Sequence, residues 1–246
     1  MSKEIKRFKA GDSITVEEIA ATIDHSLLRP DITVSELKEG CDVAKKYNCI
    51  SVCVRPSDLE IVCEELKGTE ILPTTVIAFP HGTATTESKV FETKDAIEKG
   101  AVEVDVVMNV GKFLSGEYDY VLNDLKAVTE AAHAMNAEVK VIFENHYLTE
   151  EQIIKACEIA VEAGVDFVKT STGYAETGSK NEDLKIMRAN ITDSMEVKSA
   201  GGVRTLDESL AVLATGTVRI GTRGTAVILD EAVKRAEAGN LVVTNS

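Results

Sequence analysis

Residues 138–170 read EVKVIFENHYLTEEQIIKACEIAVEAGVDFVKT, and this stretch contains one complete strand–helix–strand unit. Its two apolar runs, Glu138–Phe143 and Val165–Thr170, lack strict polar alternation, which is typical of parallel strands covered on both faces. Between them, a Thr-x-x-Gln capping box at 149–152 predicts the start of a helix. Gly164 stands where that helix should end, because glycine tolerates the left-handed conformation there. The stretch therefore predicts a crossover helix between two parallel strands.

The same unit recurs along almost the whole chain. Further capping boxes begin at Thr33, Ser57 and Thr205, and further helix-ending glycines stand at Gly68, Gly100, Gly216 and Gly239. The eight predicted strands are Ala21–Asp24, Ile50–Val54, Thr74–Phe79, Val102–Met108, Glu138–Phe143, Val165–Thr170, Met195–Ser199 and Thr217–Gly221. Eight such units in 246 residues predict an α/β fold, a single-domain (β/α)₈ TIM barrel over residues 1–246, with residues 1–16 as an N-terminal extension.

An open doubly wound sheet is the alternative to the barrel. That fold more often carries a Gly-x-Gly-x-x-Gly turn after its first strand. The first predicted strand here ends in Asp24-His25-Ser26 instead, which favours the barrel.

The overall charge excludes some classes of partner. The chain carries 27 Lys+Arg against 41 Asp+Glu, a formal net charge of −14, whereas domains that bind nucleic acid usually show a basic surplus. A basic cluster formed by Lys3, Lys6, Arg7 and Lys9 opens the chain, but no apolar stretch follows it. We therefore expect a solvated N-terminal tail, with no signal peptide and no membrane partner.

The cysteine and histidine patterns bear on redox state and metal binding. The five cysteines include no Cys-x-x-Cys pair and lie within apolar patterns, which predicts reduced thiols in a cytoplasmic protein. The four histidines are scattered, without the spacing of a local metal site. We therefore expect no metal, although ligands from distant strands could still meet in the fold.

Burial makes an unpaired charge inside a strand costly, and four of the charged residues in the predicted strands stand out: Asp105, Lys140, Lys169 and Lys198. The three lysines are separated by 29 residues each, which predicts similar heights on three successive strands. Lys169 and Lys198 end their runs, at the rim where barrel enzymes build active sites. A single rim lysine that reaches water or pairs with a carboxylate would need no function, but the group of four indicates a site.

Clustered cations and burial both lower the pKa of a lysine. A lysine that is neutral near pH 7 can form a Schiff base with a carbonyl compound. An acid–base group such as Asp105 is then needed to move protons on the intermediates. These residues point to a carbon–carbon lyase that uses neither a metal nor another cofactor.

Glycine-rich loops follow the last predicted strands. Ser199–Arg204 and Gly221–Thr225 contain Gly-Gly and Gly-Thr-Arg-Gly, and Thr172-Gly173 follows the sixth strand. Backbone N–H groups and a helix N-terminus in such loops commonly hold a phosphate in barrels. Glycines also simply permit tight turns, so the loops predict a phosphorylated substrate only in combination.

The motifs together resemble those of the 2-deoxyribose-5-phosphate aldolases, a family of class I aldolases. The resemblance covers residues 17–239 and rests on IDHSLLRP (23–30), EVDVVMNVG (103–111), VKVIFE (139–144), DFVKTSTG (166–173), VKSAGGVRT (197–205) and RIGT (219–222). It implies a reversible cleavage of 2-deoxy-D-ribose 5-phosphate to D-glyceraldehyde 3-phosphate and acetaldehyde, in deoxyribose phosphate catabolism. It also implies a homo-oligomer, either a dimer or a tetramer.

The resemblance assigns roles to individual residues. Lys169 is implied to form the Schiff base, Lys198 to lower its pKa and assist proton transfer, and Asp105 to exchange protons with the help of a bound water. The positions implied to line the same pocket are Asp24, Cys53, Lys140 and Thr170. Those implied to bind the phosphate are Gly173, Gly201, Gly202 and Gly221.

The sequence departs from the family pattern at a few positions. Ser26 stands where threonine is usual, and Asn145-His146-Tyr147 where smaller residues are common. Arg223-Gly224 replaces a pair of small, often hydroxyl-bearing residues, and we expect Arg223 either to contact the substrate phosphate or to point into solvent or toward an acidic neighbour. Three alternatives stay open: an aldolase for another phosphorylated sugar, a non-catalytic sugar-phosphate sensor, and a metal-dependent aldolase.

Overall fold

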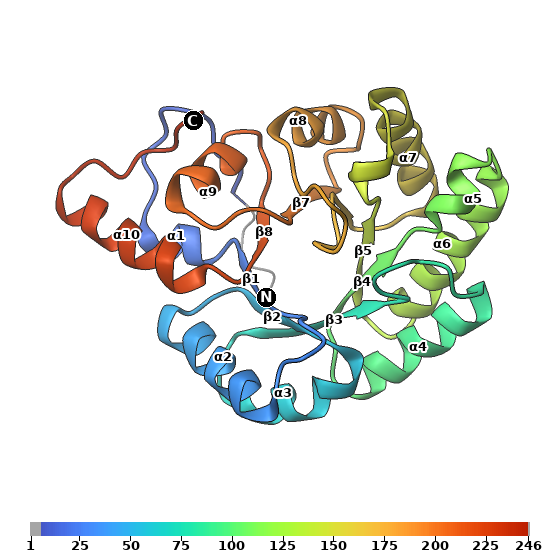
Figure 1. Cartoon of the computed structure of the whole chain (residues 1–246), viewed down its shortest axis with the longest axis horizontal. Coiled ribbons are helices and arrows are strands. Elements are labelled where there is room, and N and C mark those ends of the chain that lie inside the picture. Colours follow the sequence, from blue (N-terminus) through green and yellow to red (C-terminus); the bar gives the residue numbers. More distant parts are fainter. Residues whose placement is uncertain (1–5, 246) are drawn as a thin grey trace.

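The computed structural model describes residues 6–245, and within them eight parallel strands close into a barrel in sequence order. Figure 1 shows the ring of strands surrounded by helices. The last strand pairs with the first, where Ile220 lies opposite Ile23. The strands are β1 (Ile23–Leu27), β2 (Ser51–Val54), β3 (Leu72–Ile77), β4 (Glu103–Val107), β5 (Glu138–Ile142), β6 (Phe167–Lys169), β7 (Glu196–Ala200) and β8 (Arg219–Thr222). The predicted barrel is confirmed.

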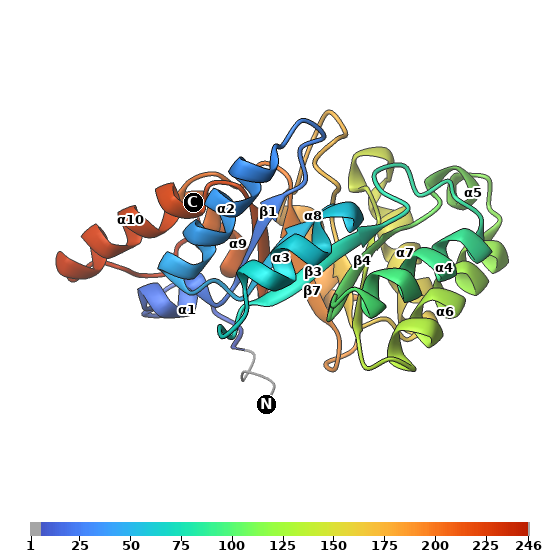
Figure 2. The same ribbon diagram turned by 90° about the horizontal axis from the view of Figure 1, so that it is seen from below.

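The helices form the outer layer. They are α1 (Val16–Ala20), α2 (Val34–Tyr47), α3 (Leu59–Glu65), α4 (Thr86–Glu98), α5 (Val110–Leu114), α6 (Tyr118–His133), α7 (Glu150–Ala163), α8 (Asn181–Ala189), α9 (Leu206–Leu213) and α10 (Thr225–Glu237), with short 3₁₀ turns at Pro56–Asp58 and Asn145–Tyr147. Figure 2 shows the loops after β1 and β6 projecting from one side of the barrel, with α1 on the other. None of the helices within residues 6–245 combines the length and apolarity needed to cross a bilayer.

Most of the predicted helix caps are present. The capping boxes at Thr33, Thr149 and Thr205 form at the starts of α2, α7 and α9. The box predicted at Ser57 is wrong, because Pro56 opens a 3₁₀ turn and α3 begins only at Leu59. A further box at Thr15 starts α1 and was not predicted, although Thr15-x-x-Glu18 matches the same pattern.

The N-terminal segment packs against the barrel. Phe8 and Ile14 are buried, and the Arg7 guanidinium donates to Glu196 at the start of β7, with a nitrogen–oxygen distance of 2.7 Å. Ser13 pairs with Val242 from the other end of the chain. The basic side chains Lys6, Arg7 and Lys9 are exposed, as the prediction of a solvated tail expects, but Phe8 and Ile14 anchor the segment to the barrel, so it is not a free tail. Lys3 lies outside the described residues.

The strands separate two kinds of core. On β4, Val104 and Val106 are buried in the apolar cluster between the sheet and the helices. The alternate residues Glu103 and Asp105 point to the other face and into the barrel, because successive side chains of a strand point in opposite directions. The fold thus places charged strand residues in the interior of the barrel.

All five cysteines are unpaired thiols, as predicted.

Candidate active site

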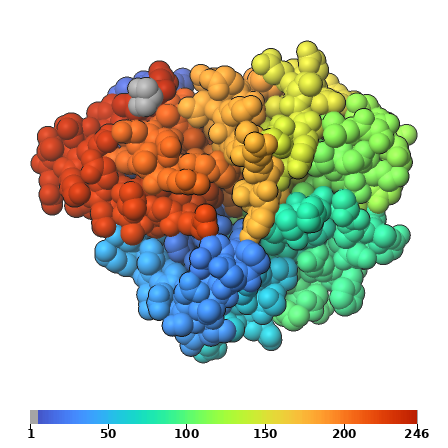
Figure 3. Space-filling model, in the orientation of Figure 1, coloured from blue at the N-terminus to red at the C-terminus, as the bar shows by residue number. Residues whose placement is uncertain are grey.

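A cavity of about 720 Å³ opens at the carboxyl ends of the strands. Figure 3 looks onto this face, where the loop after β6 lies over the centre beside the loop after β1. Tyr174 joins these two loops, because its hydroxyl donates to the carbonyl of Leu28 at 2.8 Å and its ring packs edge-on against Phe79. The cavity lining includes the predicted residues Asp24, Cys53, Lys169, Gly173, Lys198, Gly201, Gly202, Gly221 and Arg223.

Three lysines converge on the carboxylate of Asp105, which is fully buried and lies beneath the cavity rather than on its wall. Lys169 Nζ and Lys198 Nζ each lie 2.7 Å from Asp105 Oδ2, and Lys140 Nζ lies 3.2 Å from Oδ1. Lys169 and Lys198 are strand partners at the same height, as predicted. Lys140 lies lower, because the partner of Lys169 on β5 is Ile142, two residues further along. The predicted similar heights hold for Lys169 and Lys198 but not for Lys140, which pairs with Phe167 on β6.

The surroundings of Lys169 favour its neutral form. Burial lowers the pKa of this amine and the positive charge of Lys198 lowers it further, whereas Asp105 acts in the opposite direction. Burial also acts to lower the pKa of Lys198, but the carboxylates of Asp105 and Asp24 outweigh it, and the pKa of Lys198 is raised. Lys169 is thus the amine at the cavity that gives up its proton more readily than an ordinary lysine.

The three surrounding lysines keep Asp105 ionised. Burial alone would raise the pKa of this carboxyl, but Lys140, Lys169 and Lys198 hold it well below its usual range. A carboxylate in contact with an amine of lowered pKa can accept a proton from a group bound beside it and return it.

Two of the predicted pocket residues lie beneath the cavity rather than on its wall. Lys140 is fully buried and also pairs with Glu103. Thr170 is buried as well, and its hydroxyl donates to the carbonyl of Ala200 at 3.1 Å while it accepts from the N–H of the same residue. Thr170 therefore joins the end of β6 to the end of β7.

The glycine loops form the other side of the cavity. Gly173, Gly201 and Gly202 have positive φ values of 86°, 80° and 99°, a backbone conformation that other residues adopt only with strain. Gly224 is the N-cap of α10 and has no side chain that could accept a hydrogen bond. No side-chain cap therefore occupies the first N–H groups of this helix, which lie next to the loop. Such N–H groups favour an anion.

Arg223 is exposed at the rim of this loop. No hydrogen bond or ion pair of its guanidinium to another side chain is found among residues 6–245. His25 supports the loop from behind, with its Nδ1 2.8 Å from the hydroxyl of Thr225, and burial lowers the pKa of this imidazole to about 4.

Two charged residues of this cluster were missed in the sequence. Glu103 begins β4 and Arg219 begins β8, and both are buried in the barrel, where Arg219 Nη2 lies 2.7 Å from Glu103 Oε1. Both stand inside runs that were predicted as strands, so the pattern that selected Asp105 would have selected them too. Within the described part of the chain, no group of three or more His, Cys, Asp or Glu side chains is placed to hold a metal ion.

The chain is similar to known aldolases over most of its length. Residues 19–231 match the model of the DeoC/LacD family of aldolases. A protein from Clostridium novyi named deoxyribose-phosphate aldolase is 49% identical over 217 residues, which cover 88% of this chain and 97% of the relative. One from Thermococcus gammatolerans with the same name is 45% identical over 89% of this chain and 98% of its own. A tetrameric deoxyribose phosphate aldolase from Aeropyrum pernix superposes with a TM-score of 0.81 at 28% identity, over 90% of this chain and 93% of that one.

Proposed function

Because this chain belongs to the DeoC/LacD family of aldolases, we propose that it reversibly cleaves 2-deoxy-D-ribose 5-phosphate to D-glyceraldehyde 3-phosphate and acetaldehyde through a Schiff base on Lys169. The observation that carries the proposal is the placement of Lys169: its amine reaches the cavity, its pKa is lowered, and a carboxylate lies 2.7 Å away. The glycine loops across the cavity supply a place for the phosphate.

The proposed reaction begins with attack of the neutral Lys169 amine on the C1 aldehyde of the open-chain sugar. The carbinolamine hydroxyl takes a proton from the Lys198 ammonium, whose pKa is raised, and leaves as water. The resulting iminium ion withdraws electrons from C2. Asp105, directly or through a water, takes the proton from the C3 hydroxyl. The C2–C3 bond then breaks, its electron pair forms the enamine, and C3 leaves as the aldehyde of D-glyceraldehyde 3-phosphate. The proton that Asp105 took from the C3 hydroxyl is delivered to C2 of the enamine. A water then hydrolyses the iminium ion, which releases acetaldehyde and the free Lys169 amine and returns one proton to Lys198.

A substrate panel tests this proposal. We expect 2-deoxyribose 5-phosphate to yield a triose phosphate in a coupled assay, in the presence of EDTA as well as in its absence, because no proposed step uses a Lewis acid. Cleavage of another phosphorylated sugar in its place would identify a different donor or acceptor. Binding of the sugar without cleavage would favour a sensor, and loss of activity with EDTA would favour a metal-dependent aldolase.

The tetramer of the Aeropyrum pernix relative supports a homo-oligomer for this chain too, and we propose a dimer or a tetramer. A cytoplasmic location remains a prediction from the reduced cysteines.

Arg223 is expected to hold the substrate phosphate, because it lies at the cavity rim directly before the open N-terminus of α10. Charge-assisted hydrogen bonds from a guanidinium are stronger than those of the small hydroxyl residues it replaces. The Arg223→Ala variant should lose about 1.5–3 kcal/mol of binding to 2-deoxyribose 5-phosphate, measured by titration calorimetry.

Unphosphorylated deoxyribose is the control for this variant. Arg223→Ala should cleave it almost as well as the parent does, because the lost contact is to the phosphate alone. Equal losses on both substrates, or no loss on either, would remove Arg223 from the phosphate site.

A further inference from the structure

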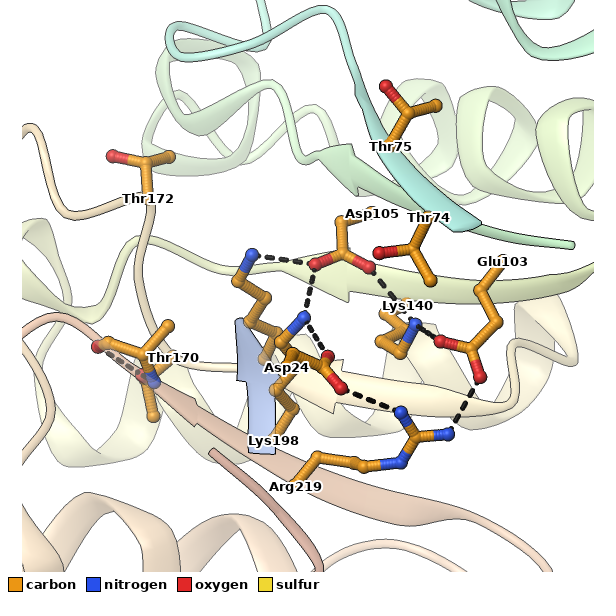
Figure 4. Close-up of polar contacts among 12 residues, drawn as sticks. Asp24, Thr74, Thr75, Glu103, Asp105, Lys140, Thr170, Thr172, Lys198 and Arg219 are labelled. Atoms are coloured by element: carbon orange, nitrogen blue, oxygen red, sulfur yellow. Dashed lines mark hydrogen bonds and ion pairs between the residues drawn. The ribbon is translucent and has the colours of Figure 1, made fainter. Parts of the chain in front are cut away.

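Six charged side chains form a closed ring inside the barrel (Figure 4). Asp105 contacts Lys198, Lys198 contacts Asp24, and Asp24 Oδ1 lies 2.7 Å from Arg219 Nη1. Arg219 contacts Glu103 at 2.7 Å, Glu103 contacts Lys140, and Lys140 returns to Asp105. Carboxylates and cations alternate around the whole ring, and the six residues come from β1, β4, β5, β7 and β8.

The ring is neutral without Lys169. Its three carboxylates balance its three cations, and Lys169 attaches to it from outside through Asp105 alone. None of the seven side chains belongs to a residue more than 8% exposed. Each ring cation contacts two carboxylates, whereas Lys169 contacts one. A protonated Lys169 would therefore leave one unbalanced charge in a buried cluster, which is costly.

We propose that Glu103 and Arg219 are positioning residues for the nucleophile: they close the ring, hold its net charge at zero and thereby make Lys169 the group that gives up its proton. Neither residue has an ion pair or hydrogen bond to Lys169, and both act through Asp24, Lys140 and Asp105. The inference rests on the proposed function in one respect: the proposed reaction needs a neutral Lys169 amine as its nucleophile.

The charges that face Lys169 from every side are consistent with this role. Asp105 on β4 and Lys198 on β7 contact or adjoin its amine, Cys53 on β2 lies near it, and Asp24 on β1 and Lys140 on β5 complete the surroundings. The pKa values of Lys140, Lys198 and Arg219 are raised despite their burial, because each is held between two carboxylates. Burial of the Cys53 thiol raises its pKa, so it adds no charge near neutral pH.

The ring predicts that substitutions of Arg219 and Glu103, which contact each other, shift the pKa of Lys169 in opposite directions. Arg219→Met leaves the ring with one negative charge, so Lys169 should keep its proton to a pH about one unit higher than in the parent. Glu103→Gln leaves one positive charge, so Lys169 should lose its proton at a pH about one unit lower. The double variant restores neutrality, and its profile should return toward that of the parent.

The protonation of Lys169 is measured without any aldolase turnover. Reductive methylation with formaldehyde and cyanoborohydride modifies neutral amines, and peptide mass spectrometry reads its extent at Lys169 across a pH series. The exposed Lys234 serves as the internal reference. Failure of the parent to form an adduct with acetaldehyde would contradict the proposed function, whereas the methylation profiles would still report on the ring.

Two variants separate charge from structural damage. Arg219→Lys keeps the charge and should leave the profile of Lys169 within a few tenths of a pH unit of the parent. Asp124→Asn breaks another buried ion pair, that of Asp124 with Lys89, and should not shift the profile. If Arg219→Met does not fold, Arg219→Gln removes the same charge with a polar side chain. Shifts of the same sign in the two single variants, or no shift in either, would overturn the proposal.

Discussion

The Lys169→Met variant is expected to lose cleavage of 2-deoxyribose 5-phosphate by on the order of 10⁴-fold in kcat, because no other amine at the cavity can replace the covalent nucleophile. Lys198 also reaches the cavity, but its contacts with Asp24 and Asp105 raise its pKa and keep it protonated. The coupled triose-phosphate assay measures the loss. The substrate should still bind, since the glycine loops are untouched.

Lys89→Met is the matched control for this variant. Lys89 is as fully buried as the site lysines and pairs with Asp124, but it lies between α4 and α6, outside the barrel interior. We expect this control to lose stability without losing kcat per folded molecule. A Lys169→Met variant that keeps more than a tenth of the parental kcat would exclude Lys169 as the nucleophile.

The Asp105→Asn variant is expected to lose about 10²–10⁴-fold in kcat, the range for removal of a positioned acid–base group. Asparagine occupies nearly the same volume but cannot take up the proton of the C3 hydroxyl. It also leaves three lysines with one carboxylate fewer, and the loss of a partner from a buried ion pair costs about 3–5 kcal/mol. The measured kcat must therefore be scaled to the folded fraction, determined by circular dichroism.

Asp124→Asn shows how much of this loss comes from the broken ion pair. It makes the same chemical change next to a buried lysine and away from the cavity, so its kcat should stay close to that of the parent. If both variants lost activity to the same degree after scaling, Asp105 would stabilise the barrel and would have no part in proton transfer.

The strands and helices could be predicted because their signals are local. Apolar runs, capping residues and helix-ending glycines each act within a few residues, and they located all the strands of the barrel to within a few residues. The largest error is at β1, which was expected to end at Asp24 but continues to Leu27. The polar residues there are stabilised by Arg219 on β8 and by Thr225 at the start of α10, about 200 positions away. No local pattern contains those partners.

For the candidate site, local patterns predicted several of the residues but not their pairing. Charges inside apolar runs identified Asp105 and the three lysines, because burial makes such residues unusual. Which carboxylate meets which cation depends on closure of the barrel, which brings β8 beside β1 and aligns β5 with β4. The contact between Glu103 and Arg219, and with it the closed ring, follows only from that three-dimensional arrangement.

Reductive trapping tests the central claim most directly. The parent protein is incubated with acetaldehyde and borohydride, digested, and mapped by mass spectrometry. We predict a two-carbon adduct on Lys169, formed also in the presence of EDTA and absent from the Lys169→Met variant. An adduct on Lys140 or Lys198 in its place, or no adduct in a protein that cleaves 2-deoxyribose 5-phosphate, would contradict the account.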